Sequence, residues 1–378
     1  MPALDDIVQQ KLRVLEAKHL RRALADTERV SGVRVRRGGR ELVSFSCNDY
    51  LGLSHHPEVI AAGKRALEKY GAGAGASRLV TGNYPLYDEL EAALAKVKGT
   101  KTACVFGSGY LANIGAIPAL VGAGDLIIAD KFIHACMYDA ARLSGATIMR
   151  FAHNNLAHAR MLLEADRAEH HHCLLLTETV FSMDGDRALL ADLAALAKEF
   201  DAWLMSDDAH GLGVLPKSAS PADIQMGTLS KAAGTYGGYI CGSEILIDYL
   251  KTASRSLIYS TGLPPSVMAS SIAALKIMAK DSKLVQKPLK NAQYFTSLLG
   301  IKEAESAIVP VILKENDRAL AAAKLLEDRG FLVSAIRPPT VPEHTARLRF
   351  AFSALHEKAQ IEALAEIIKE QGWCEPQH

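Results

Sequence analysis

The chain has 378 residues, of which 49% are hydrophobic, so it can bury a core larger than that of one average domain. The 43 basic and 42 acidic residues are mixed along the sequence and leave a formal net charge of +1. This balance excludes a single-sign field that would attract nucleic acid or an anionic membrane, and it favours a small-molecule partner.

The N-terminal stretch MPALDDIVQQKLRVL carries acids before bases and has no apolar region of the kind found in export signals. Later segments are also too short or too polar to cross a bilayer, so we expect a cytoplasmic protein without membrane contact. Six scattered cysteines without CxxC spacing argue against a disulfide framework or a zinc site. We therefore expect ordinary core thiols.

Apolar residues at helical spacing over residues 5–27 predict an amphipathic helix, and the following GVRVRRGGRELVSF predicts a short basic hairpin. From about residue 58 the sequence alternates between helical and strand patterns. EVIAAGKRALEKYG and LLADLAALAKEF indicate helices, whereas TACVFGSG, DLIIAD, HHCLLLTETV and AWLMSDDAHG contain apolar runs of strand length. Such alternation predicts an α/β domain with a mainly parallel sheet that is buried on both faces.

The pattern changes between residues 282 and 310. VPVIL, DRALAAAKLLEDRG, FLVSAIR, RLRFAF and a terminal helix then indicate a smaller α+β unit. We predict an N-terminal helix and hairpin segment at residues 1–45, a large α/β domain at 46–285 and a small C-terminal domain at 286–378.

Lys231 lies among small residues in GTLSKAAG, which leaves room for a bulky cofactor beside its amine. A lysine near a cationic or apolar site loses its proton more readily, as Schiff-base formation requires. Taken alone, Lys231 would be interpreted as a solvated surface residue, because buried functional lysines are rare.

The stretch AWLMSDDAHG places Asp207, Asp208 and His210 at the carboxyl end of a buried strand, where α/β sheets bind ligands. A buried carboxylate there can keep the pyridine nitrogen of pyridoxal phosphate (PLP) protonated, and we assign Asp207 to this role. By spacing alone Asp208 could equally serve, and both carboxylates could instead bind Mg²⁺. His210 could contact the ring hydroxyl or cap the turn.

CVFGSGYLAN follows a predicted strand and opens an apolar helix. Backbone amides near Ser108, Gly109 and Tyr110 are therefore placed to hold a phosphate, although many such glycine turns bind nothing.

Several motifs in sequence order resemble the α-oxoamine synthases, PLP enzymes with fold type I, the aspartate-aminotransferase-like fold. They are SCNDYLGLSHHPEVI, GAGAGASRLVTGN, SGYLAN, FSMDGD, DDAHGLGV, GTLSKAAG, IYSTGLPP and IRPPTVP. The resemblance implies a homodimer with shared active sites. It also implies decarboxylative condensation of an amino acid with an acyl thioester. SRLVTG and IRPPTVP are most similar to the members that use L-alanine and pimeloyl-CoA or pimeloyl-ACP in biotin biosynthesis. Other members make aminolevulinate, aminoketobutyrate or ketosphinganine.

By this resemblance, Lys231 forms the Schiff base, Asp207 pairs with the ring nitrogen and His210 binds the ring oxygen. His134 of DKFIHAC stacks on the ring and is a catalytic candidate that could polarise the acyl carbonyl. The further cofactor contacts implied are Gly109, Tyr110, Ser182, Thr228 and, from the second subunit, Ser260 and Thr261.

Asn48 of CNDYLG and Arg349 of RLRF resemble the family's anchors for the amino-acid carboxylate, and an arginine fork suits that group. Arg22 and Thr340 resemble contacts to the acyl substrate, with Arg21 as an alternative to Arg22. The stretch from His210 to Lys231 is shorter than in the family pattern. Ala233 and RLRFAFSALH also depart from it, which affects the acyl pocket more than the chemistry.

Three other interpretations are weaker. GAGAGA at residues 71–76 fits a dinucleotide-binding pattern, but it follows a predicted helix instead of a strand. His153, His158 and the HHH run at 170–172 have no standard metal-ligand spacing, so we expect no metal. A catalytically silent partner subunit is disfavoured by the presence of Lys231, Asp207 and His210.

Overall fold

The computed structural model describes residues 3–216 and 220–374. The described chain forms two compact units, one from Met1–Cys47 with Leu289–His378 and the other from Asn48–Pro288. We call them unit 1 and unit 2. In the part of the chain described, no helix has the length and apolar character needed to cross a bilayer.

Unit 2 is built around a seven-stranded sheet with the order β4-β10-β9-β8-β7-β5-β6, in which only β10 runs antiparallel to its neighbours. The strands are β4 Thr102–Phe106, β5 Leu126–Asp130, β6 Thr147–Phe151, β7 Cys173–Glu178, β8 Trp203–Asp207, β9 Ile224–Thr228 and β10 Gly238–Gly242. This is the predicted, mainly parallel sheet of an α/β domain.

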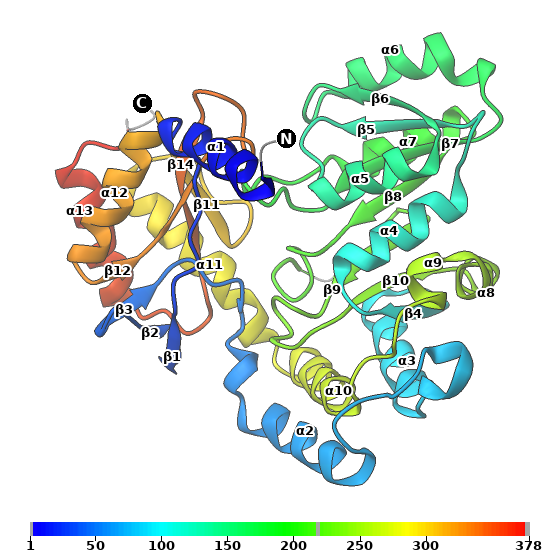
Figure 1. Cartoon of the computed structure of the whole chain (residues 1–378), viewed down its shortest axis with the longest axis horizontal. Helices are drawn as coiled ribbons and strands as arrows, with labels where there is room; N and C mark the ends of the chain where they lie inside the picture. The colour runs from blue at the N-terminus through cyan, green and yellow to red at the C-terminus, as the bar shows by residue number, and fades with distance from the viewer. Residues whose placement is uncertain (1–2, 217–219, 375–378) are drawn as a thin grey trace. The chain divides into compact units, whose positions relative to one another are not determined.

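Helices cover both faces of this sheet (Figure 1). The helices of unit 2 are α2 Pro57–Tyr70, α3 Leu86–Lys98, α4 Gly109–Leu120, α5 Ala135–Ser144, α6 Leu156–Asp166, α7 Leu190–Glu199, α8 Glu244–Ala253, α9 Arg255–Ile258 and α10 Pro265–Lys280. One apolar core joins α4, α5 and α8 to the sheet, and another joins α6 and α7 to its opposite face. Burial on both faces explains why these strands are almost uninterrupted apolar runs.

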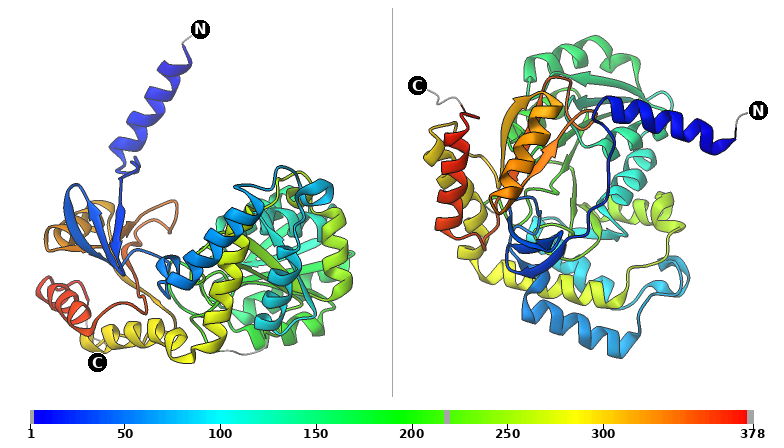
Figure 2. Two further views of the ribbon diagram at one scale, coloured as in Figure 1. Left: turned by 90° about the horizontal axis from the view of Figure 1, so that it is seen from below. Right: turned by 60° about the vertical axis from the view of Figure 1, so that its left-hand side comes forward.

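Unit 1 holds two smaller sheets, with orders β1-β2-β3-β12 and β11-β14-β13. Its strands are β1 Glu28–Ser31, β2 Arg34–Arg37, β3 Arg40–Ser44, β11 Ile308–Lys314, β12 Phe331–Leu332, β13 Ser334–Ile336 and β14 Ala346–Ala351. Its further helices are α12 Asn316–Asp328 and α13 Lys358–Glu370, whereas α11 Ser282–Leu299 begins in unit 2 and continues into unit 1. Figure 2 shows β1, β2 and β3 beside the C-terminal elements that complete this α+β unit.

The predicted hairpin at β2 and β3 is present, and its turn residues Gly38 and Gly39 both have positive φ, as a tight hairpin turn requires. The N-terminal helix is shorter than predicted. Helix α1 spans Leu4–Ala17 only, because His19 takes a left-handed conformation with φ 55° that ends the helix.

Candidate active site

The predicted cofactor residues other than Ser260 and Thr261 lie at one edge of the seven-stranded sheet. β5, β7, β8 and β9 are parallel, so the loops that follow them leave the sheet at the same edge. These loops carry His134, Ser182, His210 and Lys231, while Asp207 ends β8. The turn after β4 opens α4 with Gly109 and Tyr110.

Asp207 is a buried carboxylate held in a fixed orientation. It is 4% exposed, its Oδ2 accepts a hydrogen bond from Asn113 Nδ2 at 3.0 Å, and its Oδ1 accepts one from the Ala209 N–H at 2.9 Å. Asn113 lies on α4, so Asp207 faces the side of the sheet that α4 and α5 cover.

Asp208 has a different environment. Its Oδ2 lies 2.5 Å from Lys98 Nζ, and both side chains are almost fully buried. Consecutive residues of an extended chain point to opposite faces, which separates the two adjacent carboxylates. The Lys98 ammonium neutralises Asp208, so no Mg²⁺ is needed to compensate its charge.

His210 belongs to a hydrogen-bonded chain of three side chains. Its Nδ1 lies 2.7 Å from the Tyr50 hydroxyl, which is also 3.2 Å from Asn48 Oδ1. Tyr50 is fully buried and His210 is 6% exposed. The structure therefore links two predicted site residues through a tyrosine that fixes the orientation of the imidazole.

His134 caps the N-terminus of α5, where its Nδ1 accepts a hydrogen bond from the Cys136 N–H at 3.2 Å. Part of the residue is exposed, yet the surrounding protein desolvates the ring and lowers the pKa of His134. The negative charge of Asp207 opposes this shift, whereas the positive charge of Lys231 adds to it. His134, Asp207 and Lys231 thus lie within electrostatic reach of one another.

Glu178 is a further acid in this group that sequence reasoning missed. It ends β7 directly opposite Asp207 of β8 and is 2% exposed. Burial raises the pKa of Glu178 well above its usual value, the charge of Asp207 raises it further, and the charge of Lys231 opposes both. The backbone N–H groups of Ser182 and His134 act in the opposite direction and lower this pKa.

The turn before α4 presents free backbone donors. The Ser108 hydroxyl caps the helix by accepting from the Leu111 N–H at 3.2 Å. Among the described residues, none accepts a hydrogen bond from the N–H of Gly109 or Tyr110. A Cβ atom at Gly109 would lie 2.9 Å from Met226 Cε, the end of a flexible side chain, so this turn packs closely against β9.

Thr228 ends β9, and Lys231 lies on the loop that follows it. The Thr228 hydroxyl donates to the Gly237 carbonyl at 2.8 Å and is 3.2 Å from the Ser230 N–H, which closes the loop. Gly234, with φ 67°, would clash with the backbone of Ser54 if it carried a Cβ atom. The small residues around Lys231 therefore serve close backbone packing.

Ser260 and Thr261 lie between α9 and α10, away from the β9 loop in sequence. Thr261 is exposed and forms an isolated bridge with Ser77, and the Gly262 N–H donates to the Ala76 carbonyl at 2.9 Å. These bonds attach the segment to the glycine-rich stretch before Arg78.

The remaining predicted residues belong to unit 1. Arg22 and Thr340, far apart in sequence, are brought together by a hydrogen bond of 3.0 Å from Arg22 Nη2 to Thr340 Oγ1. Arg21 instead pairs with Glu16. Arg349 lies on β14 and is 5% exposed, so it is no surface strand residue.

The structure also bears on the weaker interpretations. The glycine-rich stretch at 71–76 joins α2 to a short π-helical turn at Arg78–Gly82, so it does not connect a strand to a helix. Over the described ranges, no cluster of three His, Cys, Asp or Glu side chains is arranged to hold a metal ion. His172 stacks on Trp203, and His158 accepts from the Ala152 N–H.

Tyr50, Asn113 and Glu178 all lay within motifs or strands that the sequence singled out. An acid at the end of an apolar strand is a signal that could have identified Glu178. No comparable signal existed for Tyr50 and Asn113, because their roles depend on partners that are distant in sequence.

Comparison with known proteins places the chain in a family. The family model for aminotransferase class I and II matches residues 40–368. An 8-amino-7-oxononanoate synthase of Methylobacterium nodulans is 56% identical over 371 residues, covering 98% of each chain. One from Beijerinckia indica is 52% identical over 97% of this chain and 98% of its own.

Among solved structures, a serine palmitoyltransferase from S. paucimobilis with a bound PLP–myriocin aldimine has a TM-score of 0.91 at 30% identity, covering 97% of both chains. An 8-amino-7-oxononanoate synthase from Francisella tularensis has a TM-score of 0.73 at 26% identity, covering 88% of this chain and 99% of that one. Because the family model and these relatives span almost the whole chain, the protein belongs to the class I and II aminotransferase family.

Proposed function

We propose that this protein uses pyridoxal phosphate to condense L-alanine with a pimeloyl thioester, releasing carbon dioxide and forming 8-amino-7-oxononanoate for biotin biosynthesis. The observation that carries the proposal is identity of 52–56% over nearly the full chain to several 8-amino-7-oxononanoate synthases. We assign cofactor binding to residues 46–285 and the small domain to residues 286–378, with residues 1–45 as an N-terminal segment.

The residues at the sheet edge fit this cofactor. Buried Asp207 offers a carboxylate to a pyridinium nitrogen. The N–H groups of Gly109 and Tyr110, which donate to none of the described residues, offer an anion site at a helix N-terminus. In the proposed site Lys231 would bind the aldehyde carbon of the cofactor and His134 would lie against its ring. Contacts to the ring oxygen and phosphate come from Ser182, His210, Thr228 and, from a second subunit, Ser260 and Thr261.

When bound, pyridoxal phosphate supplies an electron sink that stabilises negative charge at the substrate Cα. The free amine of Lys231 takes the Cα proton and later returns a proton to the product. Arg349 and Asn48 hold the amino-acid carboxylate until it leaves as carbon dioxide. Because its lowered pKa keeps His134 neutral at pH 7, its ring can donate a hydrogen bond to the acyl carbonyl during condensation.

Arg22 and Thr340 are the proposed contacts for the acyl chain. Their mutual hydrogen bond places a guanidinium beside a hydroxyl, a pair that can bind the distal carboxylate of a pimeloyl group. An uncharged acyl chain would offer that guanidinium no opposite charge.

A second candidate is another α-oxoamine synthase that uses glycine or serine. The TM-score of 0.91 to a serine palmitoyltransferase favours it, but sequence identity there is only 30%. Discrimination between alanine and glycine depends on one methyl group, worth about 1 to 3 kcal/mol. We propose alanine, and we place the protein in the cytoplasm as a homodimer.

The test is a visible-absorption titration of the purified holoenzyme with L-alanine, glycine and L-serine, followed by addition of pimeloyl-CoA while released thiol is recorded. We expect alanine to shift the cofactor band and pimeloyl-CoA to release thiol. Thiol release only from acetyl-CoA or a long-chain donor would show that the protein is another α-oxoamine synthase with a different acyl substrate. Absence of any cofactor band would refute the proposal.

Lys231→Ala provides the matched test of the site. The variant should lose turnover together with the absorption of the lysine-bound cofactor, because no other amine replaces the Schiff-base partner. Lys98→Ala is not an equivalent control, since its ion pair with Asp208 is buried; Lys276→Ala, on the surface of α10, should keep both signals. Activity retained in Lys231→Ala would overturn the assignment.

A further inference from the structure

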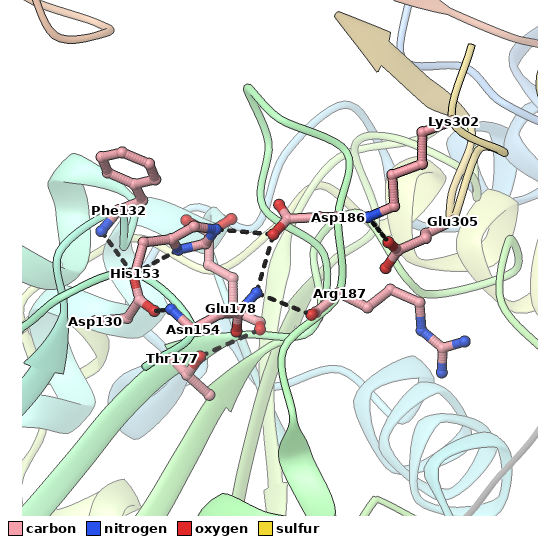
Figure 3. Close-up of polar contacts among 10 residues, drawn as sticks. All are labelled: Asp130, Phe132, His153, Asn154, Thr177, Glu178, Asp186, Arg187, Lys302 and Glu305. Atoms are coloured by element: carbon pink, nitrogen blue, oxygen red, sulfur yellow. Dashed lines mark hydrogen bonds and ion pairs between the residues drawn. The ribbon is translucent and has the colours of Figure 1, made fainter. Parts of the chain in front are cut away.

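His153 bridges two loops at the edge of the sheet that carries the candidate site. It follows β6, and its ring lies between the carboxylates of Asp130, at the end of β5, and Asp186, beyond the end of β7 (Figure 3). Nδ1 is 3.0 Å from Asp130 Oδ1, and Nε2 is 2.8 Å from Asp186 Oδ2.

The next residue, Asn154, forms a second bridge between the same two aspartates. The Asn154 N–H donates to Asp130 Oδ2 and its side-chain Nδ2 donates to Asp186 Oδ2, both at 2.9 Å. Phe132 and Phe181 pack against the His153 ring at centroid distances of 4.6 and 4.4 Å. The His153 side chain is consequently only 20% exposed.

One imidazole can donate hydrogen bonds to two carboxylate oxygens only if both of its ring nitrogens carry a proton. The His153 ring between these carboxylates is therefore in the protonated form. Burial opposes that charge, but the hydrogen bonds to Asp130 and Asp186 outweigh it and raise the pKa of His153 to about 10. The His153 ring therefore carries a positive charge at pH 7.

Each of the two aspartates belongs to a loop that carries a predicted cofactor contact, and each accepts hydrogen bonds within that loop. Asp130 Oδ1 accepts from the Phe132 N–H at 2.8 Å and its carbonyl accepts from Ile133, immediately before His134. The Asp186 carbonyl accepts from the Phe181 N–H at 3.0 Å and closes the hairpin that contains Ser182.

Glu178 is a buried acid that interacts with the same two loops. Burial raises its pKa, whereas the backbone N–H groups of Ser182 and His134 lower it. The carboxyl group is thus within electrostatic reach of both loops, while the His153 imidazolium bridges Asp130 and Asp186 directly.

We propose that His153 is a positioning residue of the cofactor site, which holds the His134 loop at a fixed separation from the Ser182 loop by bridging Asp130 and Asp186. The inference rests on the proposed function for the identity of the ligand. The bridge itself does not touch the cofactor. Its removal leaves Asp130 and Asp186 without their shared cation and with only the hydrogen bonds of Asn154 between them, so the separation of the two loops is less tightly fixed.

The test compares PLP binding to the apo forms of the wild type, His153→Gln and Asp186→Asn at a temperature where circular dichroism shows all three to be folded. We expect His153→Gln to weaken PLP binding by about tenfold, which is the usual effect of losing a residue that orients the direct ligands of a bound group. The induced circular dichroism of bound cofactor should also change. Asp186→Asn, which keeps the shape, should weaken binding less. The double variant should be no worse than His153→Gln, because both changes break one bridge.

His172→Gln is the matched control, since His172 precedes β7 at the opposite edge of the sheet and stacks on Trp203. Its PLP affinity should equal that of the wild type. Unchanged affinity and unchanged induced dichroism in both His153→Gln and Asp186→Asn would overturn the positioning role. Failure of the wild type to bind PLP would instead refute the proposed function.

Discussion

At the scale of one residue, His356 shows how burial dictates a protonation state. Its ring is 7% exposed, stacks on Phe45 at 3.9 Å and lies in unit 1. Nδ1 accepts from the Ser353 N–H at 2.9 Å and Nε2 lies 3.0 Å from the Ser44 carbonyl, which is the pattern of a neutral imidazole. Burial lowers the pKa of His356 to about 4.

Acid should therefore destabilise unit 1 through His356. The unfolded chain takes up this proton near pH 6.5 and the folded chain only near pH 4, so the stability contribution is complete above pH 6.5 and is lost as the pH falls. The free energy of unfolding should drop by about 3 kcal/mol across this window from this group. Urea unfolding at pH 7 and pH 4.5 measures it. His356→Gln should be less stable at pH 7 but lose less on acidification. An equal acid loss in that variant would contradict the assignment.

At the scale of secondary-structure elements, one buried ion pair joins the π-helical turn at Arg78–Gly82 to helix α3 and strand β4. Arg78 Nη1 lies 2.6 Å from Glu91 Oε1 and 3.1 Å from the Val105 carbonyl. The same Glu91 oxygen accepts from the Val105 N–H at 2.8 Å. The Arg78 guanidinium also stacks on Tyr87, whose hydroxyl accepts from the Leu263 N–H. This network connects β4, which leads to the phosphate turn, with the loop after Thr261.

Glu91→Gln leaves the buried Arg78 charge without its partner and should lower the free energy of unfolding by about 3 to 5 kcal/mol. Glu89→Gln on the same helix is the control, because its pair with Lys276 is exposed and should contribute less than about 1 kcal/mol. Urea midpoints of the two variants and the wild type decide the comparison. Equal midpoints for both variants would show that the buried pair adds nothing beyond a surface pair.

At the scale of the whole molecule, the proposed dimer predicts that each active site uses residues of both subunits. If Ser260 and Thr261 serve the partner's site, a hybrid of one Lys231→Ala subunit and one Ser260→Ala/Thr261→Ala subunit has one intact site and one doubly defective site. Co-expression with two affinity tags isolates this hybrid, which should show about half of the wild-type activity. Activity near zero would show that both residues serve their own subunit.

The sequence by itself determined the local elements and the chemistry available to them. Apolar runs such as LLL in β7 predicted buried strands because burial on both faces leaves no room for polar alternation. The apolar run of AWLMSDDAHG placed Asp207 at the carboxyl end of a strand, where α/β sheets bind ligands, whereas His134 was assigned only by resemblance to a family. The apolar spacing predicted a helix that continues beyond Ala17, where helix α1 ends. Apolar periodicity does not reveal the left-handed backbone of His19, which ends the helix.

Only the tertiary structure decided which polar groups meet. Adjacent Asp207 and Asp208 were equivalent by spacing, yet the first bonds Asn113 and the second pairs with Lys98. Tyr50 beside His210 and His153 between two carboxylates likewise join residues far apart along the chain. Hydrogen bonds and pKa values depend on distances of a few ångströms and on burial, which periodicity cannot encode and which appear only when separate strands pack side by side.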